Sequence, residues 1–164
     1  MNPFFLSLPV IVLSAGLASA EMRAHVSAPW DGKTVPSGQQ CTLNGGTGKT
    51  PPFQVTGIPD GAVMLVVEYN DKSYRPLSTK GGHGTLGYPV TGNAGKFPAV
   101  PGLSAKLPSG VRVIKKARGS GEYASAGYLP PCSGGKGNQY QAEVKAINAQ
   151  GKVLAKTKMD LGRY

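Results

Sequence analysis

The chain has 164 residues and a formal net charge of +10, from 18 lysines and arginines against 8 aspartates and glutamates. Its 24 glycines and 14 prolines, with few runs of helical period, argue against a helical bundle and favour short strands joined by ordered loops. The basic residues are scattered, apart from the cluster Lys115-Lys116-Ala117-Arg118, which we interpret as a solvated face.

Residues 1–20 are predicted to be a cleavable secretory signal. They carry no charged side chain, are mostly apolar, and end in Ala-Ser-Ala, small residues that a signal peptidase accepts. The apolar run is shorter than the roughly 20 residues of a spanning helix. An uncleaved anchor is the alternative, because no basic residue precedes the run. Cleavage near Ala20 would leave residues 21–164 as one periplasmic or secreted domain, for which nucleic acid is not an expected partner.

The next elements are strands, which together predict an all-β fold. Residues 63–69 form a short, β-branched apolar run between turn residues, as expected of a buried central strand. Residues 140–147 alternate between apolar and polar, which indicates a half-buried strand, and the turn after them leads into residues 152–158, the expected hairpin partner. The other predicted strands are 23–27, 53–56, 84–90 and 111–115.

The segment 75–110 is rich in glycine, proline and serine. Such a segment is either disordered or a set of functional loops on a scaffold. Interspersed apolar residues favour ordered loops: Leu86, Tyr88, Phe97, Val100 and Leu103.

The two cysteines, Cys41 and Cys132, are far apart in the chain. In an oxidising compartment such a pair usually forms a disulfide, which would stabilise the fold by up to roughly 4–5 kcal/mol through the loop it closes. Two free thiols or a metal site are the alternatives. No histidine or cysteine lies at metal-site spacing from them, so no metal is predicted.

The segment Gly45-Gly46-Thr47-Gly48-Lys49-Thr50 is similar to part of a nucleotide-binding phosphate loop. The complete motif needs a glycine where this chain has Leu43, and a helix directly after the loop. Pro51-Pro52 follows instead, which favours an extended chain. We therefore predict neither nucleotide binding nor any other cofactor.

Nucleophilic catalysis has few candidate residues. A Ser-His-Asp arrangement needs a positioned base, and the only histidines are His25 and His83. No Gly-x-Ser-x-Gly elbow occurs. His25 is expected at the surface or edge of the first strand. His83 follows two glycines at the start of a strand, where its side chain could be aimed into a pocket, so a functional and a structural role are both open. No catalytic residue is predicted, and the protein is not expected to be an enzyme.

Several motifs then follow one another in a specific order. They are the segments 31–36 with Cys41-Thr42, Pro51-Pro52-Phe53, 57–61, 83–89, 127–132 and 137–140. In this order and spacing they resemble the phosphatidylethanolamine-binding protein family, also called Raf kinase inhibitor-like, and in particular its bacterial exported branch. The resemblance covers roughly residues 24–158. It implies a β-sandwich of two antiparallel sheets, with a small pocket at one end that binds phosphate, acetate or a phosphoryl head group.

The resemblance also implies the ligand-binding residues. Asp71 matches the second Asp of the family's D-P-D motif, whose other two positions are Tyr69 and Asn70 in this chain, and His83 matches the strand histidine. In the remaining motifs the matching residues are Pro131, before Cys132, and Tyr140, the Tyr of H-R-Y. The His and Arg of H-R-Y become Asn138 and Gln139.

Those last replacements alter the chemistry expected of the pocket. Neutral amides donate hydrogen bonds about half as strong as charge-assisted ones. We therefore expect weaker or altered anion binding by Asp71, His83, Pro131, Asn138 and Tyr140. Because the family's exported branch also has cysteines at these places, the resemblance supports the disulfide between Cys41 and Cys132.

The leading prediction is thus an exported, non-enzymatic binding protein for a small anionic ligand or phospholipid head group, with modulation of a partner protein left open. One alternative is an envelope-associated protein whose basic surface makes peripheral contact with anionic lipid or polysaccharide. Another is a hydrolase or lipid-modifying enzyme that uses His83 with Asp71.

Overall fold

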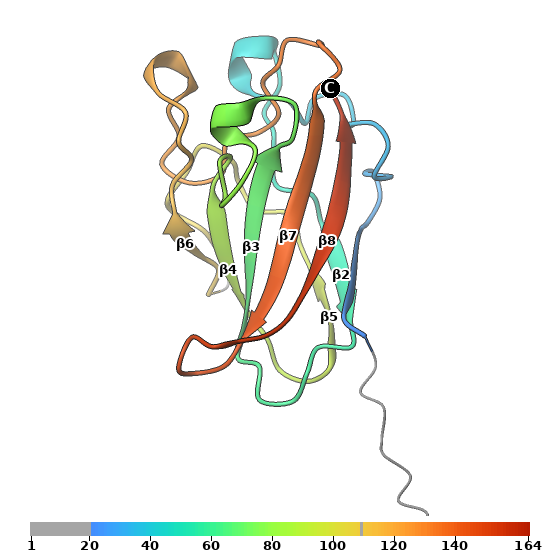
Figure 1. The fold of residues 1–164 in the computed structure, drawn as a ribbon. Helices are drawn as coiled ribbons and strands as arrows, with labels where there is room; N and C mark the ends of the chain where they lie inside the picture. Colours follow the sequence, from blue (N-terminus) through green and yellow to red (C-terminus); the bar gives the residue numbers. More distant parts are fainter. Residues whose placement is uncertain (1–20, 109) are drawn as a thin grey trace, which may run out of the picture.

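The computed structural model describes residues 21–108 and 110–164, in which eight strands form two antiparallel sheets packed face to face (Figure 1). The smaller sheet has the order β1-β2-β5, and the larger has the order β6-β4-β3-β7-β8. The helical segments described are single 3-10 turns, so the predicted all-β sandwich is confirmed. The strands are β1 (Arg23–Val26), β2 (Phe53–Thr56), β3 (Met64–Asp71), β4 (Thr85–Pro89), β5 (Ala94–Phe97), β6 (Arg112–Lys115), β7 (Gln139–Ile147) and β8 (Val153–Arg163), and the 3-10 turns are η1 (Thr42–Asn44), η2 (Arg75–Leu77) and η3 (Gly121–Tyr123).

The core lies between the two sheets. Because side chains alternate between the two faces of a strand, every second residue of the central strands enters it. Alternate side chains of β3 and β7 point inward and are buried, including Leu65, Val67 and Val144. The opposite sheet contributes Phe53, whose ring packs edge-on against Tyr88 at 5.1 Å between centroids. An aromatic pair of this kind adds to the stabilisation from burial and joins the two layers.

The sequence did not predict β5, which lies inside the glycine-rich segment. It pairs with β2 through Phe53↔Phe97 and Thr56↔Ala94, so its strand form depends on a distant partner. A Cβ at Gly95 would lie 2.8 Å from the Phe97 ring, so a larger residue there would force that ring to shift. The strand β8 also extends beyond the predicted 152–158, because Met159 and Leu161 are buried in the core.

The predicted disulfide between Cys41 and Cys132 is confirmed. The two Cα atoms are 5.2 Å apart across a sequence separation of 91. The bridge connects η1 to the segment before β7, and the Cys41 N–H donates a hydrogen bond to the Pro131 carbonyl at 2.9 Å. A covalent link and a backbone bond therefore hold two remote loops together.

The glycine-rich segment 45–50 has a packing role. A Cβ at Gly46 would collide with the Gln40 carbonyl oxygen, and a Cβ at Gly48 would collide with the Gln39 carbonyl oxygen and Pro130. The chain then continues into β2, with no helix at this loop. The rejection of a nucleotide loop is consistent with this geometry, because the backbone N–H groups lack the helix N-terminus that such a loop uses.

The predicted signal, residues 1–20, lies outside the described residues. In the part of the chain that the structure covers, no helix has the length and apolar character needed to cross a membrane.

Candidate functional site

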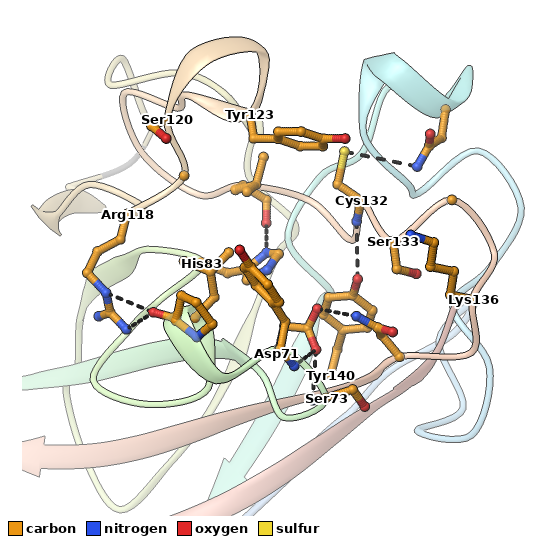
Figure 2. Close-up of a pocket in the computed structure, with 18 residues that line it drawn as sticks. Asp71, Ser73, His83, Arg118, Ser120, Tyr123, Cys132, Ser133, Lys136 and Tyr140 are labelled. Atoms are coloured by element: carbon orange, nitrogen blue, oxygen red, sulfur yellow. Dashed lines mark hydrogen bonds between the residues drawn. The ribbon is translucent and has the colours of Figure 1, made fainter.

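One end of the sandwich contains a cavity of about 650 Å³ (Figure 2). It lies where β3 ends and β7 begins, beside the short turns η1, η2 and η3 (Figure 1). The register Asp71↔Tyr140 puts the last residue of β3 opposite the second residue of β7. Strand pairing alone therefore brings two of the predicted ligand residues together.

Asp71 is 4% exposed and lines the cavity. Its Oδ1 accepts hydrogen bonds from the backbone N–H groups of Ser73 and Tyr74, at 2.9 and 3.1 Å. Its Oδ2 accepts a hydrogen bond from the Asn138 side-chain amide at 2.7 Å. The carboxylate thus closes the turn after β3 and connects it to the segment before β7.

His83 is 3% exposed, and it also lines the cavity. Its Nδ1 lies 2.8 Å from the Leu129 carbonyl oxygen, which can only accept, so Nδ1 carries the proton. Burial lowers the pKa of His83, assisted weakly by the charge of Arg118, while the Leu129 carbonyl and the Asp71 charge oppose the lowering. The imidazole is therefore neutral at pH 7, with its lone pair on Nε2.

Tyr140 packs against His83 with the ring planes at 81° and the centroids 5.3 Å apart. Its phenol oxygen accepts a hydrogen bond from the Cys132 backbone N–H at 3.2 Å. Burial raises the pKa of Tyr140 to about 12, and the Asp71 charge adds to this, while the hydrogen bonds of Ser133 and Cys132 oppose it. The side chain is therefore a neutral phenol across the physiological range.

Arg118 forms another wall of the cavity, and its role was missed because the basic cluster was interpreted as a solvated face. Its guanidinium donates to the carbonyl oxygens of Pro76, Thr79 and Lys80, and the shortest bond to each is 2.8, 2.9 and 3.2 Å. Figure 2 shows Arg118 at the edge of the cavity. Its backbone N–H donates to Gly82. Arg118 thereby fixes the η2 loop next to His83, and no local sequence signal indicated this.

The outer part of the cavity is polar and aromatic. Lys136 lies in a loop with three glycines at positive φ, on the opposite side of the Asp71–His83 pair from Arg118 in Figure 2. Tyr74 and Tyr123 also line the cavity and are 53% and 42% exposed. Sequence reasoning identified none of these three, since an isolated lysine or tyrosine carries no specific signal.

Four of the five predicted ligand residues therefore line one cavity: Asp71, His83, Asn138 and Tyr140. Pro131 does not line it; this residue is buried, and its carbonyl oxygen accepts a hydrogen bond from the Cys41 N–H. His25 is exposed on the edge strand β1, as expected. Within residues 21–108 and 110–164, no group of three or more His, Cys, Asp or Glu side chains could hold a metal ion.

Comparison with known proteins gives one informative result. No protein-family model matches the sequence, and no curated protein matches it. A solved structure of a phosphatidylethanolamine-binding protein homolog from Chlamydia trachomatis aligns with 88% of this chain and 97% of that chain, at a TM-score of 0.54 and 20% identity. This chain has a phosphatidylethanolamine-binding-protein-like fold. The fold predicted from the motif order is thus confirmed.

Proposed function

We propose that this protein is an exported, non-enzymatic binding protein whose cavity takes a small ligand with an anionic group, such as a phosphoryl head group. The observation that carries the proposal is that Asp71 and His83, both almost fully buried, line one open cavity. Buried ionisable side chains are costly, and their convergence on a concave site is typical of ligand binding. The disulfide and the predicted signal support export.

The charges around the cavity support an anionic group on the ligand. Arg118 and Lys136 line it and bring two positive charges, against the single carboxylate of Asp71 among the described lining residues. Ser73 and Ser120 add hydroxyl donors to the lining, whereas the Ser133 hydroxyl donates to the Tyr164 carbonyl. The net charge of +10 attracts anions to the whole molecule.

The non-enzymatic part of the proposal rests on the surroundings of His83. A general base that activates a nucleophile lies within hydrogen-bond reach of a hydroxyl or thiol. In the described part of the chain, the hydrogen bond of the His83 ring is to the Leu129 carbonyl, with no hydroxyl or thiol partner. The arrangement suits recognition of a ligand better than acyl or phosphoryl transfer.

The two histidines allow a test with an internal control. Inorganic phosphate or a phosphorylated head group is titrated while the ring signals of both histidines are followed by NMR. We expect the His83 signal to shift and saturate while the His25 signal stays fixed, since His25 is exposed on β1 and outside the cavity lining. His83→Ala should abolish saturable binding, whereas His25→Ala should leave it unchanged. No His83 response up to millimolar ligand would contradict the proposal.

A second candidate function is peripheral binding to anionic lipid or polysaccharide. The observation that favours it is the run of exposed lysines along β8, namely Lys152, Lys156 and Lys158, counting the turn residue before the strand. Nearby Glu68 and Glu143 are already paired with Lys145 at 2.7 and 3.2 Å, so they do not neutralise this surface. Binding to anionic vesicles that falls steeply with added salt would support this function. Binding insensitive to salt would exclude it.

A further inference from the structure

The outer face of the larger sheet carries a row of apolar side chains. The registers Met64↔Pro89, Met64↔Ile147 and Ile147↔Val153 place these four residues side by side on β4, β3, β7 and β8. Paired residues share one face of a sheet, and the next residue of β3, Leu65, is buried in the core, so the row points away from the core. Figure 1 shows this sheet in front and the smaller sheet behind it. The row is therefore turned toward solvent.

A bulge in β8 exposes two large apolar side chains at one end of this row. The pairs Ala146↔Ala155 and Ile147↔Val153 leave Leu154 without a partner in the ladder. In a regular strand one of two consecutive side chains would point inward. Here Val153 and Leu154 are both exposed, by 46% and 36%. The bulge re-aims the chain so that both side chains face solvent.

A second bulge extends the apolar surface to β6, at the other edge of the sheet. The register shift between Thr85 and Leu86 leaves Ile114 unpaired, and this side chain is 46% exposed. The Met64 Sδ and the Ile114 Cδ1 lie over Gly87, where an added Cβ would be 2.7 and 3.0 Å from them. Apolar side chains thus cross all five strands. We call them the apolar band: Met64, Pro89, Ile114, Ile147, Val153 and Leu154.

Cations border the apolar band. The neighbouring row across the sheet contains Arg112, Lys145 and Lys156. Lys145 pairs with the carboxylates of Glu68 and Glu143, at 2.7 and 3.2 Å. The other cations on or beside this face have no ion-pair partner among the described residues, and they are Arg112, Lys152, Lys156 and Lys158. The surface next to the band is therefore net positive.

This combination favours one kind of partner. A stable dimer buries about 1,200–2,000 Å² in total, which a single band cannot supply, and a second copy would bring like charges together. The centres of protein interfaces are enriched in aromatic residues, and the band contains none. An anionic bilayer, by contrast, has an apolar interior beneath a negatively charged surface. It complements both the band and its cations.

Deepening the second candidate function, on which this inference rests, we propose that the apolar band docks on an anionic phospholipid bilayer. The band lies at the boundary between head groups and acyl chains, and the unpaired cations face the lipid phosphates. The cavity takes no part in this contact. Met64 and Asp71, at the two ends of β3, are seven residues apart, which is about 23 Å along a strand. The cavity therefore stays open to solvent while the band is docked.

Tryptophan substitutions test the contact directly, since the single natural tryptophan, Trp30, is 3% exposed. Leu154→Trp lies in the band, and Leu43→Trp, in η1 at the cavity end, is the matched control because Leu43 is also exposed. Each is mixed at low salt with vesicles of phosphatidylcholine and phosphatidylglycerol that carry brominated acyl chains. The emission of Leu154→Trp should shift to the blue and be quenched, and Leu43→Trp should show neither effect. Vesicle binding with equal quenching of the two variants, or with quenching of neither, would overturn the proposal.

Serine substitutions at the same two leucines measure the contribution of the apolar contact. Leu154→Ser should weaken binding to these vesicles roughly tenfold, because a large apolar side chain no longer leaves water on docking. Leu43→Ser should bind as the wild type does. Equal affinity of Leu154→Ser and the wild type would contradict the proposal, while binding that still falls with added salt would leave the candidate function itself in place.

A pair of lysine variants separates this face from the charge of the whole molecule. Lys156→Gln removes a cation beside the band, and Lys96→Gln removes one from β5 of the smaller sheet. Lys156→Gln should weaken binding roughly fivefold and make its salt dependence shallower, with a much smaller effect of Lys96→Gln. Equal effects of the two variants would overturn the proposal.

The wild type separates this inference from the proposal for the cavity. Failure to bind vesicles of phosphatidylcholine and phosphatidylglycerol at low salt would overturn both the docking surface and the second candidate function. The phosphate titration followed on His83 would still decide whether the cavity binds an anion.

Discussion

The backbone N–H of Cys132 donates a hydrogen bond to the phenol oxygen of Tyr140, at 3.2 Å. Tyr140 lies at the buried end of the cavity and packs on His83, while Cys132 is covalently bound to Cys41. The disulfide and the candidate site are therefore directly coupled.

Tyr140→Phe should destabilise the protein by about 1–2 kcal/mol, because it removes the acceptor of a partly buried N–H and leaves the ring in place. The free energy of unfolding, measured with urea, checks this. Tyr123→Phe is a matched control, since that side chain is largely exposed. Equal stability of the two variants would show that the bond to Cys132 contributes nothing.

Reduction of the disulfide between Cys41 and Cys132 should lower the free energy of unfolding by up to roughly 4–5 kcal/mol, because a loop of 91 residues is released in the unfolded chain. Since Cys132 lines the cavity, reduction should also weaken ligand binding. Urea unfolding with and without reductant measures the first effect. Alkylation followed by mass spectrometry should find no free thiol in the unreduced protein, and two modified thiols there would refute the bridge.

The buried imidazole of His83 should make stability depend on pH. Burial lowers the pKa of His83 in the folded protein below its ordinary value of 6.5. As the pH falls through 6.5 the unfolded chain binds the proton first, so this contribution to stability is complete above pH 6.5 and is lost progressively below it. It stops changing once the pH lies below the folded-state pKa.

The measurement is the free energy of unfolding between pH 7.5 and pH 5 in the wild type and in His83→Asn, whose amide can still donate to the Leu129 carbonyl. The decline below pH 6.5 should be shallower in the variant. His25→Asn controls for the loss of a histidine at the surface. Identical slopes in the wild type and His83→Asn would rule out the neutral buried state of His83.

Arg118→Lys should loosen the η2 loop, because a lysine cannot reproduce the planar fork that bonds Pro76, Thr79 and Lys80. We expect a loss of about 1 kcal/mol, kept small by the exposure of the side chain. Faster amide hydrogen exchange in residues 77–83 is the specific readout. Lys115→Arg, in the same basic cluster, should leave that exchange unchanged, and equal exchange in both variants would mean that Arg118 does not hold the loop.

The sequence determined the sandwich and most of its strands. Alternation in residues 140–147 and the β-branched run at 63–69 specify which side chains are buried, because side chains of a strand point to opposite faces with a period of two. The strand β5 was not predicted, because its strand form depends on backbone hydrogen bonds to β2 and not on a pattern in its own residues. Two cysteines were enough to indicate the disulfide.

The site was only partly determined by the sequence. Motif order indicated Asp71, His83, Asn138 and Tyr140. The pairing of β3 with β7 then places Asp71 opposite Tyr140. Tertiary structure alone decided that Nδ1 of His83 is held by the Leu129 carbonyl, so that the buried ring is a neutral acceptor. It also decided that Arg118 uses its donors on backbone carbonyls, whereas the Lys136 ammonium has no partner among the described residues. The charge of a side chain can be read in the sequence, but the groups that occupy its donors and acceptors come from segments far away in the chain.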